Sequence, residues 1–94
     1  MESSSDLVAT RTPDVVFRNI GSGSILVNLK TNEIFELNDT GAHVWTLLSE
    51  SASTIASLSA RVCEAFDVSR IDAETHVTRL LHTFEAQGLV RLHQ

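Results

Sequence analysis

The sequence has little basic charge. Lys30 is its only lysine, and 7 basic residues stand against 12 acidic ones, for a net charge of −5. Nucleic-acid binding draws much of its affinity from clustered Lys and Arg side chains, so this balance argues against a phosphate backbone as the main partner. A basic or neutral peptide or protein suits the charge better.

Cysteine and long apolar runs are also scarce. Cys63 is the only cysteine, so no disulfide can form within the chain, and a reducing compartment is expected. No run approaches the ~20 apolar residues of a membrane span. The N-terminus lacks the charged and then apolar pattern of a signal peptide. We therefore expect a cytoplasmic protein with no membrane partner.

Catalytic and cofactor motifs are missing as well. The sequence contains no glycine-rich phosphate loop and no pair of cysteines. None of the four histidines forms a ligand pair with another histidine, an acid or Cys63, and His76 and His82 face different sides of a predicted helix. We expect no metal, no cofactor and no catalytic residue, so the chain is not predicted to be an enzyme.

The length of 94 residues and the apolar share of 43% suit one small globular domain. Residues 1–13 are polar, contain a serine run and end at Pro13, which predicts a flexible N-terminal tail. The domain itself is expected over residues 14–94.

Three β-prone runs follow the tail. They cover Val15 to Ile20, Ile25 to Lys30 and Glu33 to Leu37, with Gly21–Gly23 and Thr31–Asn32 between them. Short runs separated by turn residues predict a three-stranded antiparallel meander.

Alternation of apolar residues predicts the register of the second hairpin. A two-residue turn would pair Val27 with Glu36 and mix the faces. A three-residue loop, with Asn32 in the left-handed conformation, pairs Val27 with Phe35 and Ile25 with Leu37. This second register gives one apolar face and is preferred.

The apolar period changes to that of a helix after Leu37. Asn38 and Asp39 are candidate N-caps of a first helix, Ser53 or Thr54 begins a second, and Ser69 with Asp72 has capping-box spacing for a third. Gly88 is the expected C-cap of the third helix, and Trp45 falls at a core position of the first. The order βββααα predicts an α+β fold.

The third predicted strand and its exit carry a family resemblance. The segment from Ile25 to Asn38, followed by Gly41 and Val44–Trp45, resembles the PqqD-like family, as do Ser53–Thr54 and Gly88–Val90. The resemblance covers about residues 15–92 and implies a winged-helix-like fold. The family includes a pyrroloquinoline-quinone biosynthesis chaperone and the recognition elements of systems that modify ribosomally made peptides.

The resemblance also implies a function. The leader segment of a precursor peptide would add as a strand to the third strand, which is an edge in a meander and has free backbone donors and acceptors. The Leu-Asn-Asp-Thr-Gly segment at Leu37–Gly41 resembles the separate leader-binding proteins of lasso-peptide biosynthesis. The implied partners are the leader, a leader protease and a cyclase or other modifying enzyme, with no cofactor.

The peptide-binding residues are implied by position. We expect Ile34, His76, Arg79 and Leu80 to contact the ligand. The core is favoured over a ligand contact for Phe35, Leu37, Val77, Leu81 and Phe84. The family often has an acid where this chain has His76, so leader preference is expected to differ. The full predicted groove comprises Glu33, Ile34, Phe35, Glu36 and Leu37 on the strand side and His76, Val77, Arg79, Leu80, Thr83 and Phe84 on the helix side.

Three alternatives stay open at this stage. The chain could be a chaperone for the quinone precursor, which differs only in its precursor and partner enzyme. It could be a winged-helix regulator that binds DNA, although Asp72 and Glu74 in the first turn of the third helix would repel phosphate. It could also be a small regulatory protein with no leader ligand.

Overall fold

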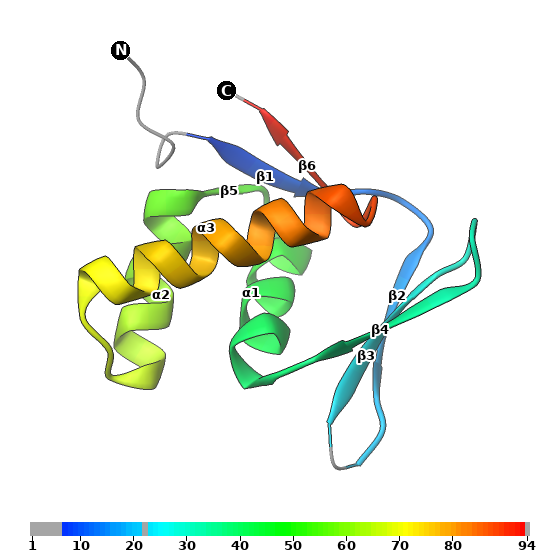
Figure 1. Ribbon diagram of the computed structural model, residues 1–94, viewed down its shortest axis with the longest axis horizontal. Helices are drawn as coiled ribbons and strands as arrows, with labels where there is room; N and C mark the ends of the chain where they lie inside the picture. Colours follow the sequence, from blue (N-terminus) through cyan, green and yellow to red (C-terminus); the bar gives the residue numbers. More distant parts are fainter. Residues whose placement is uncertain (1–6, 22, 94) are drawn as a thin grey trace.

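The computed structural model describes residues 7–21 and 23–93 and has an α+β architecture (Figure 1). Three helices and two antiparallel three-stranded sheets make up this part of the chain. In chain order the elements are β1 (Val8–Arg11), β2 (Val15–Asn19), β3 (Ser24–Asn28), β4 (Glu33–Leu37), α1 (Asp39–Glu50), β5 (Ser53–Thr54), α2 (Ile55–Phe66), α3 (Arg70–Ala86) and β6 (Val90–His93).

The predicted meander is present. Strands β2, β3 and β4 form an antiparallel sheet in that order, so β3 is central and β4 is an edge. In Figure 1 this sheet projects from one end of the helical part of the molecule. The three helices that follow it were also predicted, and the α+β class is confirmed.

The predicted register of the β3–β4 hairpin is wrong. Leu26, not Val27, pairs with Phe35, and Ile25 pairs with Glu36. Leu26 is therefore the fully buried residue of β3, while Val27 is only half-buried. Because β3 carries apolar residues on both faces, alternation alone could not show which face meets the core.

A buried polar side chain explains the observed register. Asn28 is 7% exposed, and its Oδ1 accepts a hydrogen bond from the backbone N–H of Lys30 at 3.0 Å. The N–H of Asn32 donates to the carbonyl of Asn28 at 2.7 Å, and Asn32 has the predicted left-handed conformation with φ of 63°. The hairpin loop consequently spans the four residues 29–32, one more than expected.

The second sheet was not predicted. Its order is β5–β1–β6, and β1 pairs antiparallel with both neighbours. The prediction of a flexible tail over residues 1–13 is therefore wrong for Val8–Arg11, which form a strand in which Ala9 is fully buried. Residues 1–6 of the predicted tail lie outside the described residues. The element order is accordingly not βββααα, because β1, β5 and β6 were missed.

The predicted helix starts are confirmed. Asn38 Oδ1 accepts from the N–H of Gly41 at 2.8 Å at the start of α1. Thr54, one of the two residues expected to begin the second helix, is the N-cap of α2. Ser69 Oγ accepts from the N–H of Asp72 at 3.1 Å at the start of α3. Each cap satisfies a backbone donor that has no partner within its helix.

The end of α3 lies one residue earlier than predicted, with Gln87 as the C-cap and Gly88 directly after it. Gly88 has φ of 74°, and the N–H of Leu89 donates back to the carbonyl of Phe84 at 2.8 Å, which completes a Schellman motif. Within the described residues, no helix is long and apolar enough to cross a membrane.

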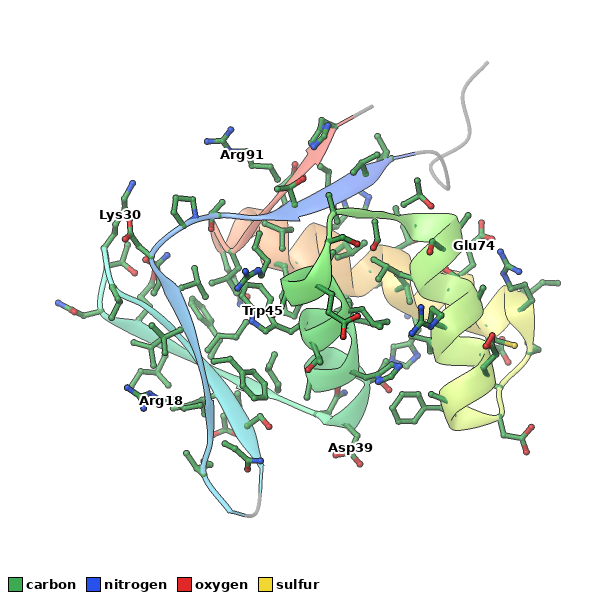
Figure 2. All side chains as sticks on the ribbon, turned by 180° about the vertical axis from the view of Figure 1, so that it is seen from behind. Arg18, Lys30, Asp39, Trp45, Glu74 and Arg91 are labelled. Carbon is green, nitrogen blue, oxygen red and sulfur yellow. The ribbon has the colours of Figure 1, made fainter. Side chains whose placement is uncertain are left out.

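The core lies where the helices meet the two sheets. Trp45 of α1 is 1% exposed and lies between α1 and the strands (Figure 2), as its helical spacing predicted. Leu89 and Val90 fold back onto this core after α3 and begin β6. The core also includes one side of each helix and the inner face of β3: Leu26, Val44, Leu48, Ile55, Leu58, Val62, Ala73, Val77, Leu81 and Phe84.

Candidate functional site

The open edge of β4 is the first component of the candidate site. Strand β4 pairs with β3 on one side, and no described strand pairs with its other side. Every second residue of an edge strand directs its backbone N–H and C=O away from the sheet, so such an edge can accept a further strand. Strand β4 is 5 residues long, which limits this pairing to a short segment.

Apolar side chains lie on both faces of the sheet at this edge. On the outer face, Val16, Val27 and Ile34 form a cross-strand row, and Ile34 at its open end is 63% exposed. On the inner face, Leu26 pairs with Phe35, which packs against the core. A strand added beside β4 would therefore meet an apolar side chain on each face of the sheet. Such cross-strand contacts between apolar side chains stabilise sheets.

A groove runs along the open edge of β4. It encloses about 340 Å³ between β4, the start of α1 and the second half of α3. Gly41 permits the close approach of β4 to α1, because a Cβ there would lie 3.3 Å from Asn38 Oδ1 and 3.4 Å from Leu37 Cδ2. The groove is lined by Ile34, Phe35, Glu36, Leu37, Asn38, Gly41, Leu80, Thr83, Phe84 and Gln87.

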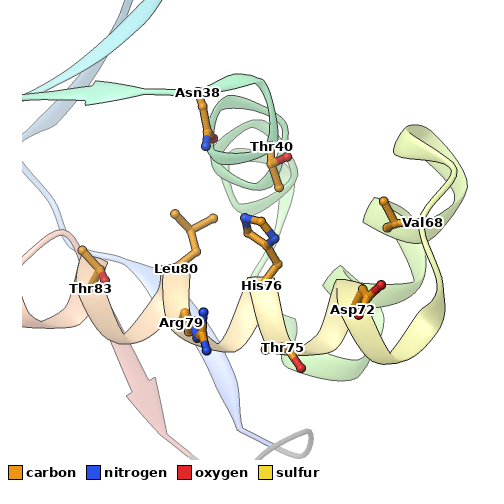
Figure 3. Close-up of a pocket in the computed structure, with 9 residues that line it drawn as sticks. All are labelled: Asn38, Thr40, Val68, Asp72, Thr75, His76, Arg79, Leu80 and Thr83. Carbon is orange, nitrogen blue, oxygen red and sulfur yellow. The ribbon is translucent and has the colours of Figure 1, made fainter.

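A second cavity lies next to this groove, along the first half of α3. It encloses about 530 Å³ and shares Asn38, Leu80 and Thr83 with the groove. His76 and Leu80 rise from α3 toward Asn38 and Thr40 of the facing segment, while the side chain of Arg79 lies below both in this view (Figure 3). The lining comprises Asn38, Thr40, Val68, Asp72, Thr75, His76, Arg79, Leu80 and Thr83.

The structure brings most of the predicted groove residues together. Phe35, Leu37 and Leu80 are half-buried, and Phe84 is 3% exposed, so these four combine core packing with a groove wall. Among the predicted residues, those that are exposed and line one of the two cavities are Ile34, Glu36, His76, Arg79 and Thr83.

Two predicted residues lie outside the cavities. Val77 is fully buried and belongs to the apolar stripe of α3, which is the core position that was favoured for it over a place in the groove wall. Glu33 is exposed on β4 and pairs with Asn28 at the hairpin end, but it lines neither cavity. Its backbone still belongs to the open edge.

Several lining residues were missed by the sequence analysis. Asn38, Thr40 and Gly41 come from the start of α1, and Asp72 and Thr75 come from α3. Asn38 and Gly41 were noted only as a helix start and a family feature. The spacing of Asp72, Thr75, His76, Arg79 and Thr83 on one helix was the signal that could have grouped the α3 residues.

The site has polar groups but no arrangement for metal binding. Among the described residues, no cluster of three or more His, Cys, Asp or Glu side chains could hold a metal ion. The structure gives one ion pair in the described part of the chain, from His82 Nδ1 to Glu85 Oε1 at 4.0 Å, and it lies outside both cavities. The geometry suits an extended chain lying between a strand edge and a helix.

Comparison with known families agrees with this geometry. The family model described as coenzyme PQQ synthesis protein D (PqqD) matches residues 23–90. The chain belongs to the PqqD family. The matched range includes the β3–β4 hairpin, α1 and α3, and so contains every residue that lines the two cavities. Comparison with curated protein sequences gives no significant match.

Two solved structures have a similar fold. One is described as lasso peptide synthetase B1 complexed with the leader peptide; it is 23% identical, has a TM-score of 0.75, and the match covers 88% of this chain and 96% of that one. The other is TbiB1 in complex with the TbiA(beta) leader peptide, also 23% identical, with a TM-score of 0.78 and coverage of 87% and 94%. At this identity the likeness establishes the shared fold of this PqqD-family chain.

Proposed function

We propose that this chain is a non-enzymatic, winged-helix-like domain that binds the leader segment of a ribosomally synthesised precursor peptide. The leader adds as a strand to the open edge of β4 and lies in the groove between β4 and α3. The observation that carries this proposal is the unpaired edge of β4 beside a groove whose other wall is α3. Strand addition satisfies backbone groups, and adjacent pockets supply selectivity.

The exposed apolar row on the outer face supports the same binding mode. Ile34 ends the Val16–Val27–Ile34 row at the open edge. An exposed apolar residue on an edge strand promotes aggregation unless another chain covers it. An added leader strand would cover Ile34 on one face and Phe35 on the other, because neighbouring residues of a strand point to opposite faces.

A lasso-peptide pathway is the proposed context. Both similar structures are described as complexes with a leader peptide, and one is named a lasso peptide synthetase. In such a pathway the domain would hold the precursor for a separate leader protease and a cyclase in the cytoplasm. Its contribution is to raise the effective concentration of precursor at the partner enzyme.

The name of the matching family model favours a second candidate. That model is described as a coenzyme PQQ synthesis protein, so the precursor could be the peptide from which pyrroloquinoline quinone is made. The two candidates share the binding mode and differ in the peptide and the partner enzyme. Titration with both precursor peptides would separate them, because only the cognate peptide should bind tightly.

The test of the proposal is fluorescence anisotropy combined with hydrogen exchange. The probe is a labelled synthetic leader from the precursor gene beside this one, with a scrambled leader and a duplex DNA as controls. Saturable binding of the leader alone, together with slowed exchange of β4 amides, is expected. No leader binding, or tighter salt-dependent binding to DNA, would refute it. Leader binding without β4 protection would refute strand addition.

A further inference from the structure

The candidate groove extends beyond the end of β4. The cavity beside β4 and the cavity along the first half of α3 share Asn38, Leu80 and Thr83, so they adjoin each other; the two together are called the channel, and the second cavity is called its extension. Strand β4 ends at Leu37, whereas the channel continues along α3 as far as Asp72. A peptide paired with β4 therefore has residues past Leu37 that lie in this extension without a strand partner.

The extension has a basic character at the end next to β4. His76 and Arg79 line it and stand within about one turn of Leu80, which separates them from the apolar groove. The Arg79 guanidinium presents several donors in a fixed planar geometry that matches a carboxylate. The imidazole of His76 has an N–H donor in either protonation state.

Arg79 is available for a ligand. No carboxylate of the described residues forms an ion pair with it, in contrast to the His82–Glu85 pair. Two other arginines have intramolecular contacts: Arg70 Nη2 donates to the carbonyl of Ala56 at 3.2 Å, and the guanidinium of Arg11 lies 5.8 Å from the centre of the Trp45 ring.

Asp72 is the one acidic residue among those that line the extension. Glu36 lines the groove beside β4 instead. Asp72 lines the far end, two turns before Arg79, which corresponds to about 10 Å along a helix axis. Glu74 and Arg79 both line a shallow hollow on a neighbouring side of α3, but Glu74 does not line the extension. A carboxylate entering from the β4 end would meet Arg79 before Asp72.

We infer that the leader carries an acidic residue just outside its strand-pairing segment and that Arg79, with His76 as a second donor, binds this carboxylate. The inference rests on the proposed leader binding. All four strand pairs in the described chain are antiparallel. An antiparallel leader strand runs from the Leu37 end of β4 to the Glu33 end, so the acidic residue lies N-terminal to the paired segment.

Peptide selection tests this inference even when the sequence of the leader is unknown. A random 14-residue display library is selected on the purified full chain, on Arg79→Glu and on Arg61→Glu. Arg61 is an exposed helical arginine on α2 outside the channel, so its reversal changes the net charge equally. Wild type and Arg61→Glu should enrich Asp or Glu at one position N-terminal to an apolar alternating segment. Arg79→Glu should lose this preference and favour Lys or Arg there.

A direct titration completes the test. In the best selected peptide, replacing the acidic residue by its amide should weaken binding to wild type about tenfold, because a charge-assisted pair is lost. The same replacement should change binding to Arg79→Gln less than about twofold. One contrary result is that the selected peptides protect the β4 amides and yet show no preference for an acidic residue. Another is that they show the same preference on Arg79→Glu as on wild type. Either result would overturn this inference and leave the proposed function intact. Failure of any peptide to protect β4 would overturn both.

Discussion

Trp45 of α1 and Phe84 of α3 meet edge to face, with ring centres 6.0 Å apart and an interplanar angle of 86°. This contact joins the two helices that border the groove, and Phe84 also lines the groove itself. Edge-to-face aromatic pairs stabilise a fold by more than the burial of their apolar area alone would. The shape of the groove thus depends on core packing directly beneath it.

Truncation of this contact should destabilise the whole domain. Trp45→Ala is expected to lower the free energy of unfolding by about 3–5 kcal/mol, as large-to-small core substitutions do. Trp45→Phe should cost less, because it keeps an aromatic ring and removes an indole N–H that is buried with no partner in the structure. Urea denaturation of both variants measures the difference. A nearly unchanged midpoint for Trp45→Ala would contradict the core assignment.

Two adjacent leucines of α3 should respond differently to a charge. Leu80 is half-buried at the groove, whereas Leu81 is fully buried in the core. Leu80→Glu should keep a cooperative melt and weaken leader binding about tenfold or more, because it places a carboxylate at an apolar contact. Leu81→Glu should unfold the domain, because the free energy needed to bury an unpaired charge is as large as the free energy of unfolding of a small domain.

Thermal melts and anisotropy titrations of these two variants provide the measurement. Loss of the cooperative melt in Leu80→Glu would place Leu80 in the core. Unchanged leader binding by a folded Leu80→Glu variant would remove Leu80 from the binding surface.

Backbone methylation of the leader should have an alternating effect. If the leader pairs with β4, every second amide of the paired segment donates to β4, while the others point away. A scan of leader peptides with one N-methyl group each should therefore weaken binding strongly at alternate positions and weakly between them. Anisotropy titrations record the pattern. Uniform losses, or losses unrelated to position, would be incompatible with strand addition.

Gly88 should be sensitive to substitution through its backbone alone. Its φ is 74°, and a Cβ there would meet only Asn28 Nδ2 at 3.9 Å, an ordinary contact. Gly88→Ala should lower the free energy of unfolding by about 1–2 kcal/mol, the cost of a left-handed conformation for alanine. Gly23→Ala is the control, since its φ is not in that region and a Cβ meets nothing within 4 Å. Equal midpoints for the two variants in urea would rule out this conformational cost.

The sequence grouped many of the residues that the structure brings together at the candidate site, but not the extent of that site. Ile34, Arg79 and Leu80 were expected at the groove from the family resemblance, and they line the channel. Val77 lies next to groove residues in the sequence, and helical geometry turns it into the core, the position that was favoured for it. The extension along α3 could not be predicted, because it forms only where α3 passes the start of α1.

The three helices and their starts follow from local sequence alone. Asn38, Thr54 and Ser69 cap the helices through hydrogen bonds to residues three positions later, and the apolar stripes follow the helical period. These interactions are local, so a short segment contains all the information that they need. The same holds for Asn32, whose left-handed conformation was predicted from its place in a hairpin loop.

The strand register and the second sheet depend on tertiary contacts, whereas the open edge of β4 was expected from the order of the meander. Strand β1 becomes ordered by pairing with β6, where Val8 lies opposite His93 from the other end of the chain. The β3–β4 register depends on a buried Asn28, which apolar alternation would place on the polar face. Such outcomes arise from contacts between distant segments and from which face the core covers, and neither is encoded in a local pattern.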